Sequence, residues 1–228
     1  MYKLIALLRS QSRSYNSSSK PPLCWKCGSN IKGTTFFCKN TTCAAIQPIK
    51  TPAPNYYDLL LPGHYKSVDQ ILSHGFNVPP DELKKHFFRL QRDLHPDKFG
   101  SGSNEERQLS EQQSTYINEA YHTLRNPLTR AQYLLSLKGI NTADESRTIS
   151  SDYDKQGFLM TVMDIQEEIE NSDDLIRIQT ENDARMQRTI NEISNAFENG
   201  QDDIAKRKTM ELKYWVTISN VLKNKIKT

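Results

Sequence analysis

The sequence predicts a mainly α-helical protein, with a helical hairpin, a C-terminal three-helix bundle and a small cysteine-rich module in front of them. Three observations support this fold class. From Tyr56 onwards, apolar residues recur at steps of three and four, which is the period of an α-helix. Prolines, acids and glycines mark the expected helix ends. All four cysteines lie between Cys24 and Cys43, before the helical part begins.

The first long helix of the hairpin is predicted to begin at Pro79 and Pro80. Prolines and acids suit the first turn of a helix, where free N–H groups and the helix dipole favour them. Pro96 cannot continue a helix, so this helix must end just before it. One narrow stripe of the helix is expected to face the core: Leu83, Phe87, Leu90 and Leu94.

The second helix of the hairpin is predicted to be capped by Ser103 or Asn104. Because the intervening loop is short, the two helices should be antiparallel. The expected buried face repeats at three- or four-residue steps: Leu109, Tyr116, Ile117, Ala120, Tyr121 and Leu124. A further short helix should run from Pro127 to about Leu137 and stop at Gly139.

The hairpin domain is assigned to residues 55–138, and the polar stretch 139–154 to a linker. Three more periodic segments follow, beginning near Phe158, Asp174 and Asp203. Three antiparallel helices over residues 155–228 are the simplest arrangement that buries their apolar faces. The residues expected on those faces are Ile178, Met186, Ile190, Ile193 and Phe197 in one segment, and Ile204, Leu212, Trp215, Leu222 and Ile226 in another.

Charge is distributed unevenly along the chain. Residues 1–57 carry eight Lys or Arg and no acid, whereas residues 58–228 carry 22 basic and 27 acidic residues, a net charge of −5. A mildly acidic body argues against nucleic-acid binding, and no segment has the roughly 18 apolar residues that span a membrane. The acid-free opening predicts a mitochondrial presequence over residues 1–19, and hence a location in the matrix. A merely disordered basic tail is the alternative.

The four cysteines form a C-x2-C pair, Cys24 and Cys27, followed by a C-x4-C pair, Cys38 and Cys43. Both spacings allow paired thiolates to share one tetrahedral zinc ion. The sequence therefore predicts a structural zinc module over residues 20–50. Four cysteine ligands leave no open position, so the zinc would stabilise the fold and take no part in catalysis. A redox-active thiol pair and two disulfides are the alternatives.

The tripeptide His95-Pro96-Asp97 falls in the loop between the two helices of the hairpin. The helix before it carries three cations opposite its apolar stripe: Lys85, Arg89 and Arg92. Alone, the tripeptide is an ordinary turn and the cations an ordinary solvated face. Together they resemble a J-domain. The resemblance implies that the loop and the cationic face bind a DnaK-type chaperone and trigger its ATP hydrolysis, with Asp97 as an exposed acceptor for a basic side chain.

Further motifs narrow the resemblance. Residues 95–99 read HPDKF, residues 117–120 read INEA and residues 127–135 read PLTRAQYLL. With these motifs, residues 56–228 resemble the HscB family, the J-proteins dedicated to iron-sulfur cluster assembly. The resemblance implies a co-chaperone that has no active site of its own. It would bind an IscU-type scaffold through its C-terminal bundle and promote cluster transfer. A general J-protein with a broad hydrophobic client surface is the rival interpretation.

The helix that contains Phe158 has two distinct sides. Phe158, Val162, Ile165 and Ile169 form an apolar stripe, and the opposite side is a mixed stripe of Met160, Met163, Asp164 and Glu167, with Leu159 at its border. Methionines flanked by carboxylates suit a partner that presents apolar and basic groups. Packing of the two methionines on a neighbouring helix is the alternative. The family resemblance assigns these positions, together with Tyr214, to binding of the IscU-type scaffold.

Overall fold

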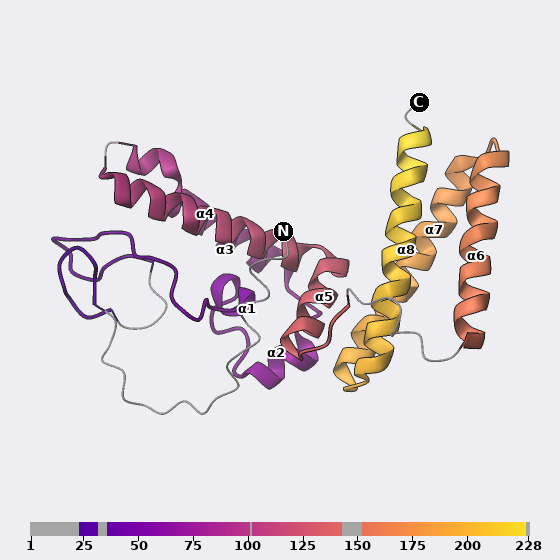
Figure 1. Cartoon of the computed structure of the whole chain (residues 1–228), viewed down its shortest axis with the longest axis horizontal. Helices are drawn as coiled ribbons and strands as arrows, with labels where there is room; N and C mark the ends of the chain where they lie inside the picture. Colours follow the sequence, from indigo (N-terminus) through magenta and orange to yellow (C-terminus); the bar gives the residue numbers. More distant parts are fainter. Residues whose placement is uncertain (1–22, 32–35, 101, 143–151, 227–228) are drawn as a thin grey trace. The chain divides into compact units, whose positions relative to one another are not determined.

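A computed structural model of the chain describes residues 23–31, 36–100, 102–142 and 152–226 (Figure 1). Within these ranges, regular structure is almost entirely α-helical, and β-pairing is confined to two isolated bridges in the cysteine module, Leu23 with Asn30 and Phe37 with Ile46. The mainly α prediction is therefore confirmed. The predicted presequence, residues 1–19, lies outside the described residues. None of the helices described is long and apolar enough to cross a membrane.

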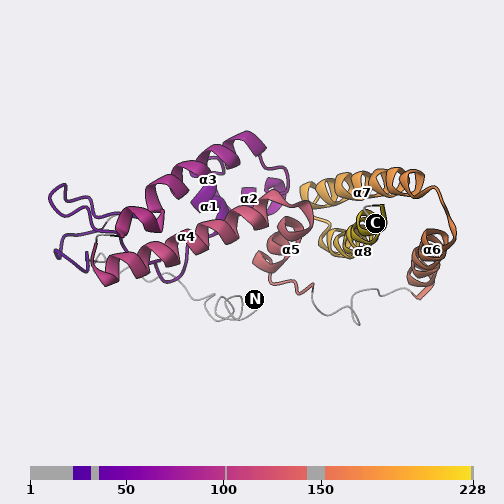
Figure 2. The ribbon, with the colours of Figure 1, turned by 90° about the horizontal axis from the view of Figure 1, so that it is seen from above.

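The chain divides into two compact units. The first contains the cysteine module, α1 (Tyr56–Leu60), α3 (Pro80–Leu94), the short 3-10 helix η2 (Pro96–Phe99) and α4 (Asn104–Arg125). Figure 2 shows α3 and α4 lying alongside each other as the hairpin. The Phe87 ring stacks on Tyr121 of α4 at 3.9 Å between centroids. The predicted stripe of α3 supplies three buried side chains to this core: Leu83, Leu90 and Leu94.

The ends of the hairpin helices follow from local sequence. Pro80 is the first residue of α3, and Asp81 and Glu82 lie in its first turn. Their negative charges interact favourably there with the positive end of the helix dipole. The Ser103 hydroxyl accepts the backbone N–H of Glu106 at 3.2 Å, and the Glu106 carboxylate accepts the N–H of Ser103 at 3.4 Å. This reciprocal pair is a capping box at the start of α4. The prediction that Ser103 or Asn104 caps this helix is thus confirmed for Ser103.

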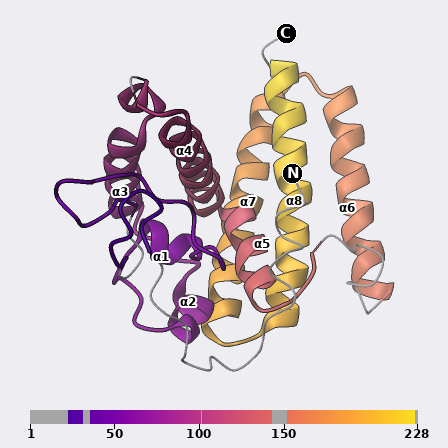
Figure 3. The same cartoon turned by 60° about the vertical axis from the view of Figure 1, so that its left-hand side comes forward.

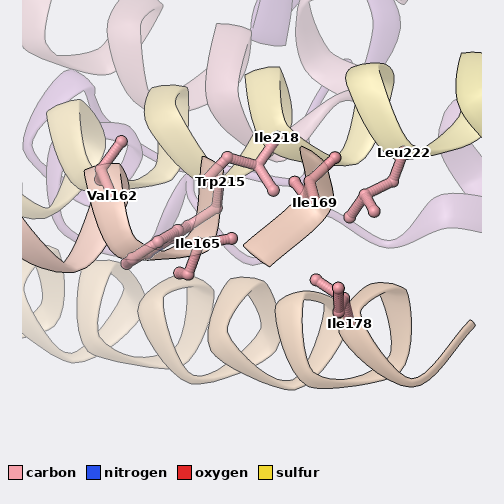
Figure 4. Packing of buried hydrophobic residues seen from close by; sticks show 7 residues of the cluster. All are labelled: Val162, Ile165, Ile169, Ile178, Trp215, Ile218 and Leu222. Carbon is pink, nitrogen blue, oxygen red and sulfur yellow. The ribbon is translucent and has the colours of Figure 1, made fainter. Parts of the chain in front are cut away.

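The second unit contains α2 (Val68–His74), α5 (Pro127–Leu137), α6 (Asp152–Asn171), α7 (Leu175–Glu198) and α8 (Asp202–Ile226). Figure 3 shows α6, α7 and α8 side by side, as the sequence predicted. Seven buried residues from all three helices form the core in Figure 4: Val162, Ile165, Ile169, Ile178, Trp215, Ile218 and Leu222. One expected core residue is different: Ile226, in the last turn of α8, is 44% exposed.

The short helix α2 was not predicted, although its start carries a signal. Ser67 caps it by accepting the N–H of Gln70 at 3.2 Å, a Ser-x-x-Gln pattern typical of helix starts. Just after α2, Phe76 stacks against Phe197 of α7 with ring centroids 5.8 Å apart, and the Arg130 guanidinium of α5 lies over the Phe76 ring at 5.0 Å. Residues 55–138, which the sequence analysis assigns to one hairpin domain, are therefore divided between the two compact units.

Candidate functional site

The His95-Pro96-Asp97 loop is a fixed turn with its carboxylate in solvent. His95 ends α3 and caps η2, because its Nδ1 accepts the backbone N–H of Asp97 at 3.3 Å. Pro96 is the first residue of η2, where a missing N–H costs nothing. The Asp97 side chain is 91% exposed, and its Oδ2 lies 3.5 Å from His95 Nδ1. The turn thus presents Asp97 as an acceptor that a partner can reach.

Buried and partly buried hydrogen bonds hold the end of α3 that leads into this loop. The Ser110 hydroxyl of α4 donates to the carbonyl of Leu94 at 2.7 Å and satisfies one of the free carbonyls at the end of α3. One turn earlier, Gln91 Nε2 donates to Asn118 Oδ1 at 2.6 Å, and the Ser114 hydroxyl donates to Gln91 Oε1 at 3.1 Å. These bonds fix the end of α3 against α4 and so fix the position of the turn.

The cationic face of α3, formed by Lys85, Arg89 and Arg92, is exposed to solvent. The Arg92 side chain is 72% exposed, and its Nε lies 3.4 Å from the carboxylate of Asp93. Burial and the neighbouring Arg89 lower the pKa of the His86 imidazole, which favours its neutral form on this face. The structure therefore places the three cations together on one open helix face that leads to the loop.

The four cysteines converge on one point. Their sulfurs all lie within 4.8 Å of one another, with Cys24 and Cys43 at 3.9 Å and Cys27 and Cys38 at 3.6 Å. A tetrahedral site with Zn–S bonds of about 2.3 Å has sulfurs about 3.8 Å apart, whereas a disulfide needs about 2.05 Å. The cluster therefore has the dimensions of a four-thiolate metal site.

The backbone around the cysteine pairs is shaped to hold thiolates. In each pair the residue after the second cysteine has a positive φ, +70° at Gly28 and +44° at Ala44. The Gly28 N–H donates to the carbonyl of Cys24 at 2.9 Å, and the Ala44 N–H donates to that of Asn40 at 2.8 Å. The two tight turns bring the sulfurs of each pair to the same side. Glycine adopts this conformation without strain, whereas Ala44 is an uncommon non-glycine residue there.

The acidity of the thiols fits a bound cation. Hydrogen bonds from the side chain and backbone of Ser29 lower the pKa of Cys27 to about 6, so this sulfur is a thiolate at neutral pH. The backbone N–H of Asn40 lowers the pKa of Cys38, but burial and its thiol neighbours raise it to about 12. All four sulfurs could therefore be thiolates at this spacing only with a positive ion among them. The residues present therefore fit a divalent metal with sulfur affinity, such as zinc.

The cysteine module is attached to α4 by side-chain contacts. Lys26 forms a salt bridge of 2.9 Å with Glu106, and this pairing lowers the pKa of the Glu106 carboxyl. The buried Gln113 side chain donates to the carbonyl of Gln47 at 2.8 Å. Gln47 Nε2 in turn donates to Cys24 Sγ at 3.3 Å. A chain of hydrogen bonds thus connects α4 to a sulfur of the four-cysteine cluster.

On α6, the mixed stripe lies opposite the buried stripe, as the periodicity predicted. Val162, Ile165 and Ile169 are buried in the bundle core (Figure 4), whereas Met160 is 59% and Met163 is 66% exposed. The two methionines are thus not packed on a neighbouring helix. Two more side chains of the stripe, Asp164 and Glu167, are also exposed.

Leu159 and Tyr214 occupy the border between this stripe and the core, and both are half-buried. The Tyr214 ring of α8 meets Phe158 of α6 edge to face, with centroids 5.5 Å apart. A groove continues from Glu167 along α6 and α8, and Val221, which is 41% exposed, contributes to its apolar lining. Sequence reasoning missed Val221, because its contribution depends on how α8 is placed beside α6.

Comparisons with known proteins cover both units. A family model described as DnaJ domain matches residues 70–133, and one described as HSCB C-terminal oligomerisation domain matches residues 154–223. The mouse iron-sulfur cluster co-chaperone protein HscB is 32% identical over 210 residues, which cover 89% of this chain and 82% of the mouse protein. The mitochondrial J-type co-chaperone jac1 of Schizosaccharomyces pombe is 36% identical over 151 residues, 64% of each chain.

Solved structures agree in fold. The crystal structure of human co-chaperone protein HscB matches with a TM-score of 0.75 and 30% identity, covering 90% of this chain and 98% of the human one. Chaperone HscB from Vibrio cholerae matches with a TM-score of 0.61 and 28% identity over 75% of this chain and 96% of that protein.

Proposed function

Because the chain belongs to the HscB family of J-domain co-chaperones of iron-sulfur cluster assembly, we propose that it delivers a cluster-loaded IscU-type scaffold to a DnaK-type chaperone. The proposed location is the mitochondrial matrix. It is supported by the acid-free composition of the first 57 residues and by the name of the Schizosaccharomyces pombe relative. The relatives of this chain are named co-chaperones, and we propose that this chain likewise acts on the ATPase cycle of its chaperone and has no catalytic site of its own.

The observation that carries the chaperone assignment is the exposed His95-Pro96-Asp97 turn at the end of a cationic helix. An acceptor that is 91% exposed, on a turn held by buried hydrogen bonds, is ready to receive a basic side chain of the chaperone without rearrangement. The cationic face of α3 would steer the encounter with an acidic surface of the chaperone. The turn then triggers ATP hydrolysis in the chaperone, while this chain contributes no reacting group.

The second contact would be made by the mixed stripe of α6. Exposed methionines adapt to an irregular apolar partner surface, and the two neighbouring carboxylates select basic groups around it. By holding the scaffold with this stripe and the chaperone with the loop, the chain raises the local concentration of scaffold at the chaperone. Chaperone closure on the scaffold would then favour release of the cluster to acceptors.

One experiment tests the whole proposal. ATP hydrolysis by the mitochondrial DnaK-type chaperone is measured alone, with scaffold, with this protein, and with both. We expect modest stimulation by either protein and a much larger effect when both are present. A response that does not depend on the scaffold would instead support a general J-protein.

Reversing the charge of Lys85, Arg89 and Arg92 to Glu should raise the concentration of protein needed for half-maximal stimulation by at least tenfold. Wild-type stimulation should weaken as salt rises, because exposed charges are screened beyond about 8 Å at 0.15 M ionic strength. A titration of chaperone ATPase at low and high salt measures both effects. Reversing three exposed cations of the other unit, Lys66, Arg188 and Lys223, is the matched control. Stimulation that is insensitive to salt would contradict the electrostatic role.

Replacing Met160 and Met163 together by Ala should weaken scaffold binding by about 1 to 3 kcal/mol, since a few apolar anchors dominate small interfaces. Asp164→Lys combined with Glu167→Lys should have a similar effect. Isothermal titration of scaffold into the folded variants measures the loss, and Val68→Ala, at another exposed apolar position (60%), is the control. Stimulation without scaffold should match the wild type. Unchanged scaffold affinity would remove α6 from the interface.

A further inference from the structure

One aromatic side chain lies on the cationic face of α3 and is largely in solvent. Phe88 is 56% exposed, which makes it the most exposed aromatic residue among those described. Neither the core stripe nor the proposed set of charges accounts for it. A single exposed apolar residue is usually unremarkable, so its surroundings decide whether it has a role.

Phe88 is surrounded by positive charge. On a helix, residues three and four positions apart are neighbours, and these positions around Phe88 include Lys84, Lys85 and Arg92. Phe88 precedes His95 by seven residues, which is about 10 Å along the helix at 1.5 Å per residue. A typical protein interface of about 800 Å² per partner is roughly 30 Å across. One partner bound at the loop would therefore also cover Phe88.

The Phe88 ring packs against the neighbouring ring of Phe87. Its centroid is 5.3 Å from that of Phe87, at a tilt of 58°, and Phe87 is itself stacked on Tyr121 at 3.9 Å. A side chain that has only two rotatable bonds and already packs against another ring loses little conformational entropy on binding. Aromatic residues placed in this way are the usual apolar anchors of interfaces.

We infer that Phe88 is an apolar anchor of the chaperone-docking surface, so that this J-domain binds its DnaK-type partner by burying an aromatic ring as well as by charge. The inference rests on the proposed function. The partner must present an apolar hollow bordered by carboxylates. A second copy of the same cationic face would be repelled, and a scaffold that suits the acidic stripe of α6 has the wrong sign of charge for α3.

The test uses the full chain in single-turnover chaperone ATPase titrations, with Phe88→Ala and Phe88→Lys. Both variants should raise the half-stimulating concentration about tenfold and leave the maximal rate unchanged, because the triggering loop is intact. Phe88→Lys is decisive, since it adds the charge that a purely electrostatic surface would favour. Ile176→Ala, which removes a 70% exposed apolar side chain from the other unit, is the matched control and should behave like the wild type.

The outcomes separate the inference from the function on which it rests. If wild-type protein fails to stimulate the chaperone, the proposed function itself is wrong. If the wild type stimulates the chaperone and Phe88→Lys has an equal or lower half-stimulating concentration, the surface is electrostatic only and the inference is overturned. The half-stimulating concentration of Phe88→Ala divided by that of the wild type should stay the same at about 0.5 M salt. Charges are screened within several ångströms there, whereas burial of the ring is not weakened. A ratio that falls to one there would count equally against it.

Discussion

Asp97→Ala is expected to abolish stimulation of the chaperone ATPase, because it removes the exposed carboxylate that the turn presents. The side chain is 91% exposed and lies 3.5 Å from His95 Nδ1, outside the core, so its loss should leave the core and the helix ends unchanged. The free energy of unfolding should therefore stay within about 0.5 kcal/mol of the wild-type value, as for ordinary surface substitutions. His95→Gln should have the same functional effect, since the cap that orients the Asp97 backbone is altered.

Single-turnover ATP hydrolysis at saturating protein measures this loss, with circular dichroism as the folding control. Asp81→Ala is a matched variant, because it also removes an exposed carboxylate from the same hairpin but lies at the far end of α3. It should stimulate like the wild type. Scaffold binding by Asp97→Ala should be unchanged. A normal stimulated rate for either loop variant would refute the J-domain mechanism.

Removal of the metal is expected to have the second large effect, which is unfolding of the cysteine module. We expect one zinc ion per chain in the purified protein. Structural zinc sites contribute roughly 10 kcal/mol or more to the stability of small modules, so chelation or Cys38→Ser should leave residues 23–47 without a stable fold. The α3/α4 hairpin has its own apolar core and should remain folded. The backbone amides of α4 near Glu106 and Gln113, which contact the module, should nevertheless lose protection against hydrogen exchange.

Trp25 provides a local signal for this experiment. Its indole N–H donates to the carbonyl of Ile46 at 2.7 Å, so unfolding of the module should change its fluorescence. The other tryptophan, Trp215, lies in the bundle core and can be replaced by Phe to isolate that signal. Elemental analysis measures the metal, and hydrogen exchange measures the effect on α4. Asp97→Ala should keep full metal content. A protein without bound metal, or a hairpin that unfolds with the module, would contradict this account.

The sequence by itself determined the features that depend on neighbouring residues. The periodicity of α3, its proline start and its stop at Pro96 predicted the helix, its buried stripe and the position of the exposed loop. Each of these is a consequence of residues fewer than five positions apart. The same holds for the capping of α4 by Ser103 and for the two-sided pattern of α6, where the side that avoids the core carries Met160 and Met163.

Only the tertiary structure decided the features that depend on distant parts of the chain. Cysteine spacing predicted two pairs that share one site, and the fold brings all four sulfurs within 4.8 Å of one another, with Cys24 3.9 Å from Cys43 and Cys27 3.6 Å from Cys38. The bond from Gln113 to Gln47 joins residues 66 positions apart and attaches the module to α4. The packing of Phe76 on Phe197 places α2 with the C-terminal helices. Local patterns fix which face of a helix is apolar, but which surface covers that face depends on the path of the whole chain.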